Sequence, residues 1–199
     1  MNFFKTSLFF TITAITSLST LINPVFASTL VSFSSSIRYG NAGANENLEL
    51  STLNARDVNL LSKDLNLKLS IGTEGSAVKF TNLTIGNSYV FDWTLATQET
   101  RGEDIFYLFD GTSLTALGTS RIATQNVGGG WRVAPKVQTT EFRVQSSNVM
   151  LILLDTRDKS FTSIVKINKL RRVPEGSAVL GILSLVVIGI YRVKKGTRI

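Results

Sequence analysis

The sequence predicts an all-β fold: a single β-sandwich flanked by an N-terminal signal peptide and a C-terminal transmembrane helix. Short runs rich in β-branched and aromatic residues recur through residues 28–172, and turn residues separate them. This body has about 145 residues, the size of one domain with a two-layer core. The sequence has no internal repeat of solenoid or propeller length, so a sandwich is the expected architecture.

The individual elements follow from hydrophobic periodicity and turn residues. Residues 53–61 are expected to form one short helix, because Leu53, Val58 and Leu61 share a helical face. The alternation of leucine and isoleucine with polar residues over 65–71 has period two and predicts a strand. Gly86, Asp110-Gly111 and the glycines at 128–130 mark turns or loops. Further strands are expected at 78–80, 89–95, 105–109, 131–133, 140–145, 149–154 and 160–169.

The aromatic residues of the sequence suggest either core packing or sugar binding. Tyr89, Phe91 and Trp93 recur at period two and are expected to pack in the core from one sheet. Trp131 follows the glycine-rich loop and is the best candidate to stack on a sugar ring. Its neighbour Arg132 is a candidate to hydrogen-bond an acidic glycan.

The composition excludes several kinds of site. The chain has no cysteine and no histidine, which rules out disulfides, thiol nucleophiles, a Ser-His-Asp triad and the usual zinc sites. Although the whole chain carries a net charge of +7, residues 28–172 hold 16 Lys/Arg against 13 Asp/Glu, a balance of +3. The remaining excess lies in the two ends, so no nucleic-acid partner is expected.

Residues 1–27 read as a secretory signal peptide. Lys5 supplies the basic region, residues 8–22 the apolar region, and Val25-Phe26-Ala27 the small-residue cleavage signal. Signal peptidase is therefore expected to cut between Ala27 and Ser28. The alternative is an N-terminal membrane anchor.

The C-terminal tail, residues 173–199, combines a polar motif, an apolar run and a basic end. The apolar run, 178–191, predicts a short membrane-spanning helix, and the basic end, 192–199, stays cytoplasmic by the positive-inside rule. Val173-Pro174-Glu175-Gly176 precedes the run and resembles the PEP-CTERM sorting signal, in which Val-Pro-Glu-Pro is usual. The resemblance implies recognition and cleavage by an exosortase-type membrane protease. Retention as a simple membrane anchor is the alternative.

Two segments of the body extend this resemblance. Residues 73–79 read Thr-Glu-Gly-Ser-Ala-Val-Lys, and residues 91–99 read Phe-Asp-Trp-Thr-Leu-Ala-Thr-Gln-Glu, as in the ectodomain of many PEP-CTERM proteins. The resemblance implies a jelly-roll-like sandwich without established catalytic activity, exported to the cell surface or extracellular matrix and often linked to exopolysaccharide. We therefore expect a role in adhesion or scaffolding, or alternatively a carbohydrate-binding module.

Several carboxylates are candidate ligands of a hard cation. Glu74, Glu99, Asp104 and Asp158 lie at expected strand ends and loops, and calcium takes several oxygen ligands gathered from loops. The alternative is ordinary turn chemistry, because acidic residues favour turns and protect sheet edges. Glu99 and Asp104 also allow a glycosidase pair, which requires two carboxylates on opposite sides of a sugar.

Overall fold

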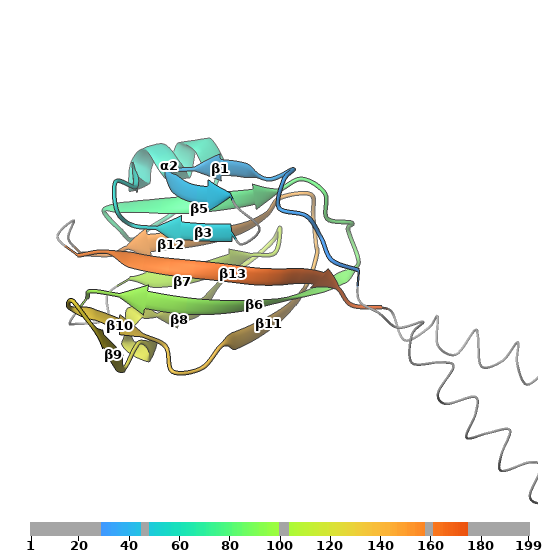
Figure 1. Ribbon diagram of the computed structural model, residues 1–199. Coiled ribbons are helices and arrows are strands. Elements are labelled where there is room, and N and C mark those ends of the chain that lie inside the picture. Colours follow the sequence, from blue (N-terminus) through green and yellow to red (C-terminus); the bar gives the residue numbers. More distant parts are fainter. Residues whose placement is uncertain (1–28, 45–47, 100–103, 158–160, 175–199) are drawn as a thin grey trace, which may run out of the picture. The chain divides into compact units, whose positions relative to one another are not determined.

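Two antiparallel sheets face each other in this protein (Figure 1). The computed structural model describes residues 29–44, 48–99, 104–157 and 161–174. Within these, Leu30–Val173 form one compact unit. The predicted β-sandwich is therefore confirmed.

Sheet A is seven-stranded and contains β2 (Asn41–Ala44), β3 (Leu48–Ser51), β6 (Ser88–Thr97), β9 (Gln125–Gly128), β10 (Trp131–Val133), β11 (Gln138–Arg143) and β13 (Ser163–Arg172). Sheet B is six-stranded and contains β1 (Ile37–Tyr39), β4 (Arg56–Asp57), β5 (Glu74–Phe80), β7 (Ile105–Phe109), β8 (Leu114–Thr119) and β12 (Val149–Asp155).

The main strands pair in a nested order. The outermost pair along the chain is β3 with β13, followed inward by β5 with β12, β6 with β10 and β11, and β7 with β8. Strands β10 and β11 both lie along β6 and act as one interrupted strand. Within this nested set, with β10 and β11 taken as one strand, successive strands cross between the sheets except at the β7–β8 hairpin. This nesting is the jelly-roll arrangement, which buries the inner face of each sheet.

The alternating pattern of β6 creates the inner core. Every second residue of this strand is buried, and Phe91 and Trp93 are 0% and 2% exposed. The Trp93 ring packs edge-on against Phe106 of sheet B, with ring centroids 5.0 Å apart. The indole Nε1–H donates to Thr140 Oγ1 over 2.9 Å, so its polar atom is satisfied. The expected core role of these aromatics is confirmed.

The centre of sheet B is covered on both of its faces. All seven residues of β12 are buried, which explains why this strand reads as an almost unbroken apolar run. Its outer side chains pack under helix α2 (Val58–Leu65), whose Val58, Leu61 and Leu65 face the sheet. Asp57 caps the helix by accepting from the amide of Asn59 at 2.9 Å. Among the described residues, the helix thus covers the outer face of sheet B around β5 and β12, whereas no α-helix covers the outer face of sheet A.

Two local expectations differ from the structure. The predicted helix exists but begins at Val58 and ends at Leu65, because Asp57 supplies the N-cap and Asn66 adopts the left-handed conformation of a C-cap. The strand predicted over 65–71 is wrong. Leu67 and Leu69 instead belong to an irregular segment that packs on the core under α2, so their alternation reflects contact with that cluster rather than strand pairing. A 3-10 turn, η2 (Ser120–Ile122), follows β8.

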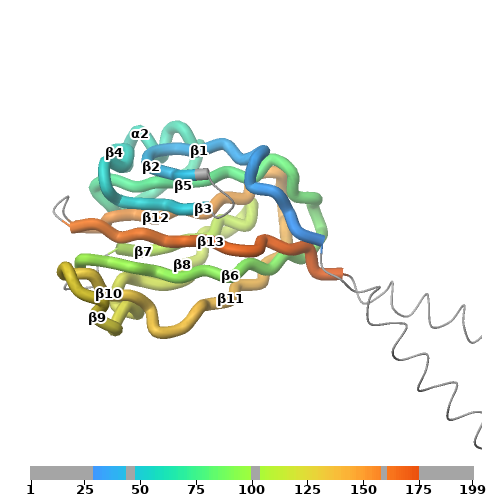
Figure 2. Tube along the Cα trace, viewed as in Figure 1, coloured from blue at the N-terminus to red at the C-terminus, as the bar shows by residue number. Residues whose placement is uncertain are grey.

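The start and the end of the described chain lie side by side. Leu30 bridges Arg171, and the amide of Val31 donates to the Leu170 carbonyl oxygen at 2.8 Å. Figure 2 shows the blue start of the chain beside the red end of β13. The expected signal peptide with its Ala27–Ser28 cleavage point, Glu175 and Gly176 of the sorting motif, and the apolar run 178–191 lie outside the described residues. Within the portion that is described, no helix is long and apolar enough to cross a membrane.

Candidate functional site

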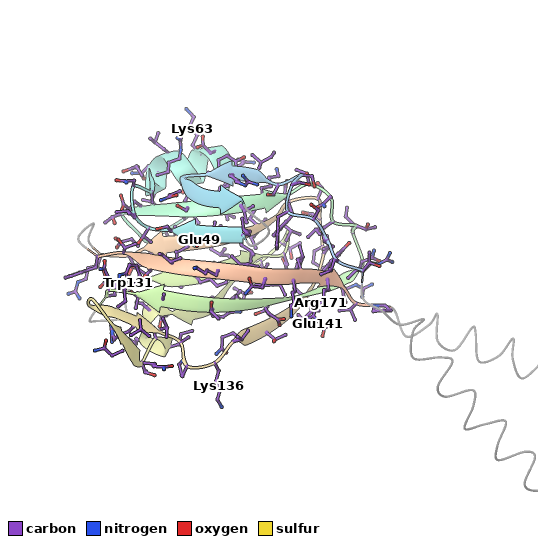
Figure 3. All side chains as sticks on the ribbon, viewed as in Figure 1. Glu49, Lys63, Trp131, Lys136, Glu141 and Arg171 are labelled. Carbon is purple, nitrogen blue, oxygen red and sulfur yellow. The ribbon has the colours of Figure 1, made fainter. Side chains whose placement is uncertain are left out.

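The outer face of sheet A, here termed the open face, is the candidate binding surface. The side chains of β6 alternate between the core and this face, and those on the open face are all partly exposed. Among the described residues, the one α-helix packs on sheet B and does not cover the open face. Figure 3 shows that the open face carries Glu49 of β3, Trp131 of β10, Glu141 of β11 and Arg171 of β13.

Asp92 organises the centre of the open face. Its carboxylate accepts from the hydroxyl of Thr139 on β11 at 2.8 Å and from the guanidinium of Arg171 on β13 at 3.3 Å. These bonds connect the two strands that flank β6 and hold their side chains in place. The open face therefore presents a preorganised polar surface, which lowers the entropic cost of binding a ligand.

A second charged pair lies further along the open face. Lys166 of β13 and Glu49 of β3 are directly opposite each other, and Nζ lies 3.6 Å from the carboxylate oxygen. Their side chains are 58% and 42% exposed, so the pair contributes little to folding stability. Both side chains are consequently available to hydrogen-bond a ligand.

Trp131 forms the aromatic edge of the open face. Val133 pairs with Ala96 on this face, and because strand side chains alternate, Trp131 lies on the same side. The preceding turn has positive φ at Gly128, Gly129 and Gly130, values of 92°, 59° and 78° that suit glycine. The indole is partly exposed at the end of this hairpin.

Arg132 points in the opposite direction. It pairs with Thr97, a fully buried residue on the inner side of β6. Its Nη2 atom is buried and has no hydrogen-bond partner within the described parts of the chain. Trp131 and Arg132, which the sequence suggested as joint glycan contacts, therefore lie on opposite faces of β10.

Three of the four predicted calcium ligands, Glu74, Glu99 and Asp104, lie toward one end of the sandwich, here termed the carboxylate end. Glu74 is opposite Asp155 across β5 and β12, while Glu99 and Asp104 are 3% and 0% exposed. Asp158 lies outside the described residues. In the ranges that the structure describes, no three acidic residues are placed so that they could hold a metal ion.

Hydroxyl groups complete the carboxylate end. The hydroxyl of Ser163 donates to Thr97 Oγ1 at 2.7 Å, and the amide of Glu99 donates to the same Thr97 oxygen at 2.8 Å. Ser120 Oγ accepts from the amide of Asp104 at 3.2 Å. These bonds hold the backbone that carries Glu99 and Asp104, both of which are buried.

Asp110 is occupied by its own turn. Its carboxylate accepts from the amides of Thr112 and Ser113, both at 2.8 Å, and from both hydroxyl groups. Burial opposes its ionisation, but hydrogen bonds from Ser113 and Thr112 outweigh this effect and lower the pKa of the carboxyl. The carboxylate thus stabilises the β7–β8 turn.

The sequence pattern contained an overlooked signal for the open face. Asp92, Thr139 and Arg171 were not singled out as functional residues, yet Asp92 occupies a polar position of β6 that alternates with the core aromatics. The partner strands become apparent only once the register is known. Alternating polar positions of an expected central strand therefore indicate an uncovered face.

Comparisons with known proteins add a distant structural likeness. Neither the comparison with protein families nor that with curated proteins gives a match. Among solved structures, the chain is similar to the secreted serine protease VesC from Vibrio cholerae, with TM-score 0.36, 11% identity, and coverage of 67% of this chain and 22% of that chain. It is also similar to the Clostridium thermocellum xylanase 10B CBM22-1–GH10 modules, with TM-score 0.34, 12% identity, and coverage of 75% and 28%.

A third structure is comparable in size to this chain. The N-terminal cellulose-binding domain of Cellulomonas fimi β-1,4-glucanase C gives a TM-score of 0.33 at 9% identity, with coverage of 71% of this chain and 89% of that chain. The chain spans less than a third of the length of the VesC and xylanase structures. At these TM-scores the likeness carries no argument about function.

Proposed function

We propose that this protein is an exported, non-enzymatic binding protein of the cell surface or extracellular matrix, and that its open face adheres to exopolysaccharide. The observation that carries the proposal is an uncovered sheet face on which Asp92, Thr139 and Arg171 are held in fixed positions, with a partly exposed Trp131 at one end of the same face (Figure 3). A saccharide presents apolar ring faces and many hydroxyl groups. An indole can stack on the former, and fixed carboxylate, hydroxyl and guanidinium groups can hydrogen-bond the latter.

Glu99 and Asp104 are the two carboxylates that could form a glycosidase pair, and their burial supports a binding role. A glycosidase needs two carboxylates that contact the substrate from opposite sides. Glu99 and Asp104 are 3% and 0% exposed, and their backbone amides donate to the buried hydroxyl oxygens of Thr97 and Ser120. A polysaccharide chain has no route to such groups without local opening of the sandwich.

Export rests on the two ends of the sequence. Signal peptidase would cut after Ala27, and the tail would hold the chain in the membrane until an exosortase-type protease acts near Val173–Gly176. The amide of Val173 still donates to the Ser88 carbonyl oxygen at 2.8 Å, whereas Pro174 is exposed. A protease would therefore meet its motif immediately after the last strand.

A binding titration tests whether the open face binds exopolysaccharide. Isothermal titration with exopolysaccharide purified from the producing cells is expected to detect binding, and Trp131→Ala should weaken it at least tenfold, about 1.4 kcal/mol. Trp131→Phe should retain part of the affinity. The matched control is Leu60→Ala, which removes a 51% exposed apolar side chain from helix α2 on the other sheet. Equal affinities for Trp131→Ala, Leu60→Ala and the unaltered protein would exclude the open face near Trp131.

The intact mass of the native protein tests the sorting step. Protein recovered from cell-surface and culture fractions is expected to start at Ser28 and to end near residues 172–176. A mass that runs from Ser28 to Ile199 would instead indicate a retained membrane anchor. That result would exclude processing and leave the binding proposal standing.

A further inference from the structure

One end of the sandwich, here termed the tail end, lies opposite the carboxylate end. The first described residues and the last strand meet there, as the bridge between Leu30 and Arg171 shows (Figure 2). The turn of Gly86 and Asn87 precedes β6 at the same end, and Arg143 closes β11 beside it. The tail of the protein therefore leaves from this end of the fold.

Arginine side chains gather at the tail end. Arg143 pairs with Ser88, Arg172 with Tyr89, and Arg171 with Val90, on the two strands that flank β6. The flanking strands are two interstrand spacings apart, so the three arginines lie within about 10 Å in the pairing direction. Arg171 is paired with Asp92 on the open face, whereas Arg143 and Arg172 both hydrogen-bond to the Gly86–Asn87 turn, and these two form the basic cluster of the tail end.

Two of these arginines retain most of their donors. Arg143 Nε donates to the Gly86 carbonyl oxygen at 2.8 Å, and Arg172 Nη2 donates to Asn87 Oδ1 at 3.2 Å. Both residues are exposed, and a guanidinium has five N–H donors in a fork that matches phosphate oxygens. Each bond orients its side chain and leaves the remaining donors toward solvent.

Acidic residues occur toward both ends of the sandwich. At the carboxylate end, Glu99, Asp104 and Asp155 are 3%, 0% and 1% exposed, and Arg56 and Arg157 belong to the same end. Toward the tail end, the carboxylate of Asp110 is held by its own turn, and the exposed Glu141 pairs with Val90, as Arg171 does. The two arginines at the Gly86–Asn87 turn therefore supply the attraction to an anionic surface.

Exposed apolar side chains accompany the basic cluster. Leu30 is 68% exposed and Ile85 is 60% exposed. Exposed apolar residues also occur elsewhere, for example Leu53 at 53%, so apolarity alone does not select an end. In the described part of the chain, the tail end combines these exposed apolar residues with the basic cluster and with the last residue before the tail.

The tail keeps this end close to a membrane. Five residues, 173–177, separate the last residue of β13 from the apolar run. A chain of five residues spans at most about 18 Å even when fully extended. If residues 178–191 enter a bilayer, the basic cluster is therefore held near the headgroups at a high effective concentration.

We propose that the tail end of the sandwich docks on the anionic phospholipid headgroups of the membrane in which the tail is anchored. This inference rests on the tail anchoring of the proposed function. Arg143 and Arg172 bind phosphate oxygens, and Ile85 and Leu30 enter the interfacial region. Docking directs the strands away from the bilayer, so the carboxylate end points outward and the open face stands beside the membrane, accessible to polymer.

A single-label quenching experiment tests the docking. The chain has no cysteine, so Ile85→Cys gives a unique site for a fluorescent label, and Leu53→Cys gives the matched label at the carboxylate end. The full chain is reconstituted in vesicles of phosphatidylcholine, with or without 30% phosphatidylglycerol, that contain a headgroup-linked quencher. We expect strong quenching of the label at position 85, weak quenching at position 53, and a clear dependence on phosphatidylglycerol.

Charge variants add a quantitative test. Each arginine near an anionic surface contributes about fivefold to the ratio of docked to undocked protein, so Arg143→Gln with Arg172→Gln should lower this ratio roughly 30-fold. The matched control, Lys63→Gln with Lys68→Gln, removes two exposed charges at and beyond the end of helix α2 and should leave the ratio unchanged. Raising the salt concentration should mimic the arginine variant.

The outcomes separate the two proposals. If the chain sediments with vesicles but the label at position 85 is quenched no more than that at position 53, docking is overturned and anchoring stands. Equal quenching in vesicles without phosphatidylglycerol overturns the role of anionic headgroups. A chain that stays in the supernatant overturns the anchoring, and docking with it.

Discussion

Gly75 allows helix α2 to pack closely on sheet B. A β-carbon at this position would lie 2.5 Å from Leu154 Cδ2, 2.7 Å from the Leu153 carbonyl oxygen and 3.1 Å from Leu61 Cδ2. The first and third contacts involve side chains that can rotate. The second involves backbone of the neighbouring strand β12, which can move only if the ladder between β5 and β12 is distorted.

The substitution Gly75→Ala should therefore be strongly destabilising. Inserting a methyl group into a packed core typically costs 1–3 kcal/mol, and the immobile carbonyl oxygen places this site at the upper limit, about 3 kcal/mol. The helix would also have to lift from the sheet and expose part of Leu61, which is now 0% exposed. For a domain of this size, the loss corresponds to a fall in Tm of roughly 6–12 °C.

Thermal unfolding followed by circular dichroism measures this effect, and Gly43→Ala is its control. Gly43 also lies in a strand, but a β-carbon there would lie 3.9 Å from Glu49 Cβ and 4.0 Å from the Glu49 carbonyl oxygen, which are ordinary contact distances. That variant should keep the Tm or raise it slightly, because alanine lowers the entropy of the unfolded chain. Equal Tm values for the two variants would refute the close-packing argument.

Three other perturbations have defined outcomes. Hydrogen bonds lower the pKa of the Asp110 carboxyl, so the ionised carboxylate stabilises the fold above pH 3.8, the ordinary pKa, and this stabilisation is lost as the pH falls through the pKa of the folded protein. Asp110→Ala should remove this step from a plot of unfolding free energy against pH. Thr140→Val should cost about 1–2 kcal/mol in urea unfolding, because the indole N–H of Trp93 loses its acceptor, whereas an unchanged midpoint would show that the bond is dispensable. If the predicted calcium site forms, calcium at a hundredfold excess over Kd should add about 2.7 kcal/mol to stability, and Asp158→Asn should abolish the gain; identical melting with calcium and with chelator would argue against the site.

The central strands could be predicted from the sequence because local patterns determine them. The segment 105–109 coincides with β7, 131–133 with β10, and 149–154 matches β12 except for its last residue. In each, β-branched, leucine or aromatic residues occur in a run bounded by turn residues, so propensity and burial agree. The nested pairing of these strands was expected only through the family resemblance.

The edge strands could not be predicted in the same way. Strands β2 and β9, Asn41–Ala44 and Gln125–Gly128, each have a single neighbour in sheet A and contain few residues of high β propensity. Their conformation is imposed by pairing with β3 and β10, which is a tertiary interaction. Conversely, 65–71 has a strand-like pattern but no partner strand, so packing under the helix determines its course.

The candidate site was only partly accessible from sequence. Trp131 could be singled out because a large aromatic beside three glycines is unusual, whereas its neighbour Arg132 required the register with β6 to show that it points inward. The arrangement of Asp92 between Thr139 and Arg171 joins residues 47 and 79 positions apart. No local pattern reports such a contact.

The central position of β13 has a mechanical consequence. This strand is hydrogen-bonded to β3 on one side and to β6 on the other, and its final residue directly precedes the tail. A pull transmitted from an anchored tail, against polymer held by the open face, would act along the axis of the strand. The hydrogen bonds on both sides would then be loaded together in shear instead of opening one after another, which slows forced unfolding. Such a connection would let the fold bear tension without a disulfide.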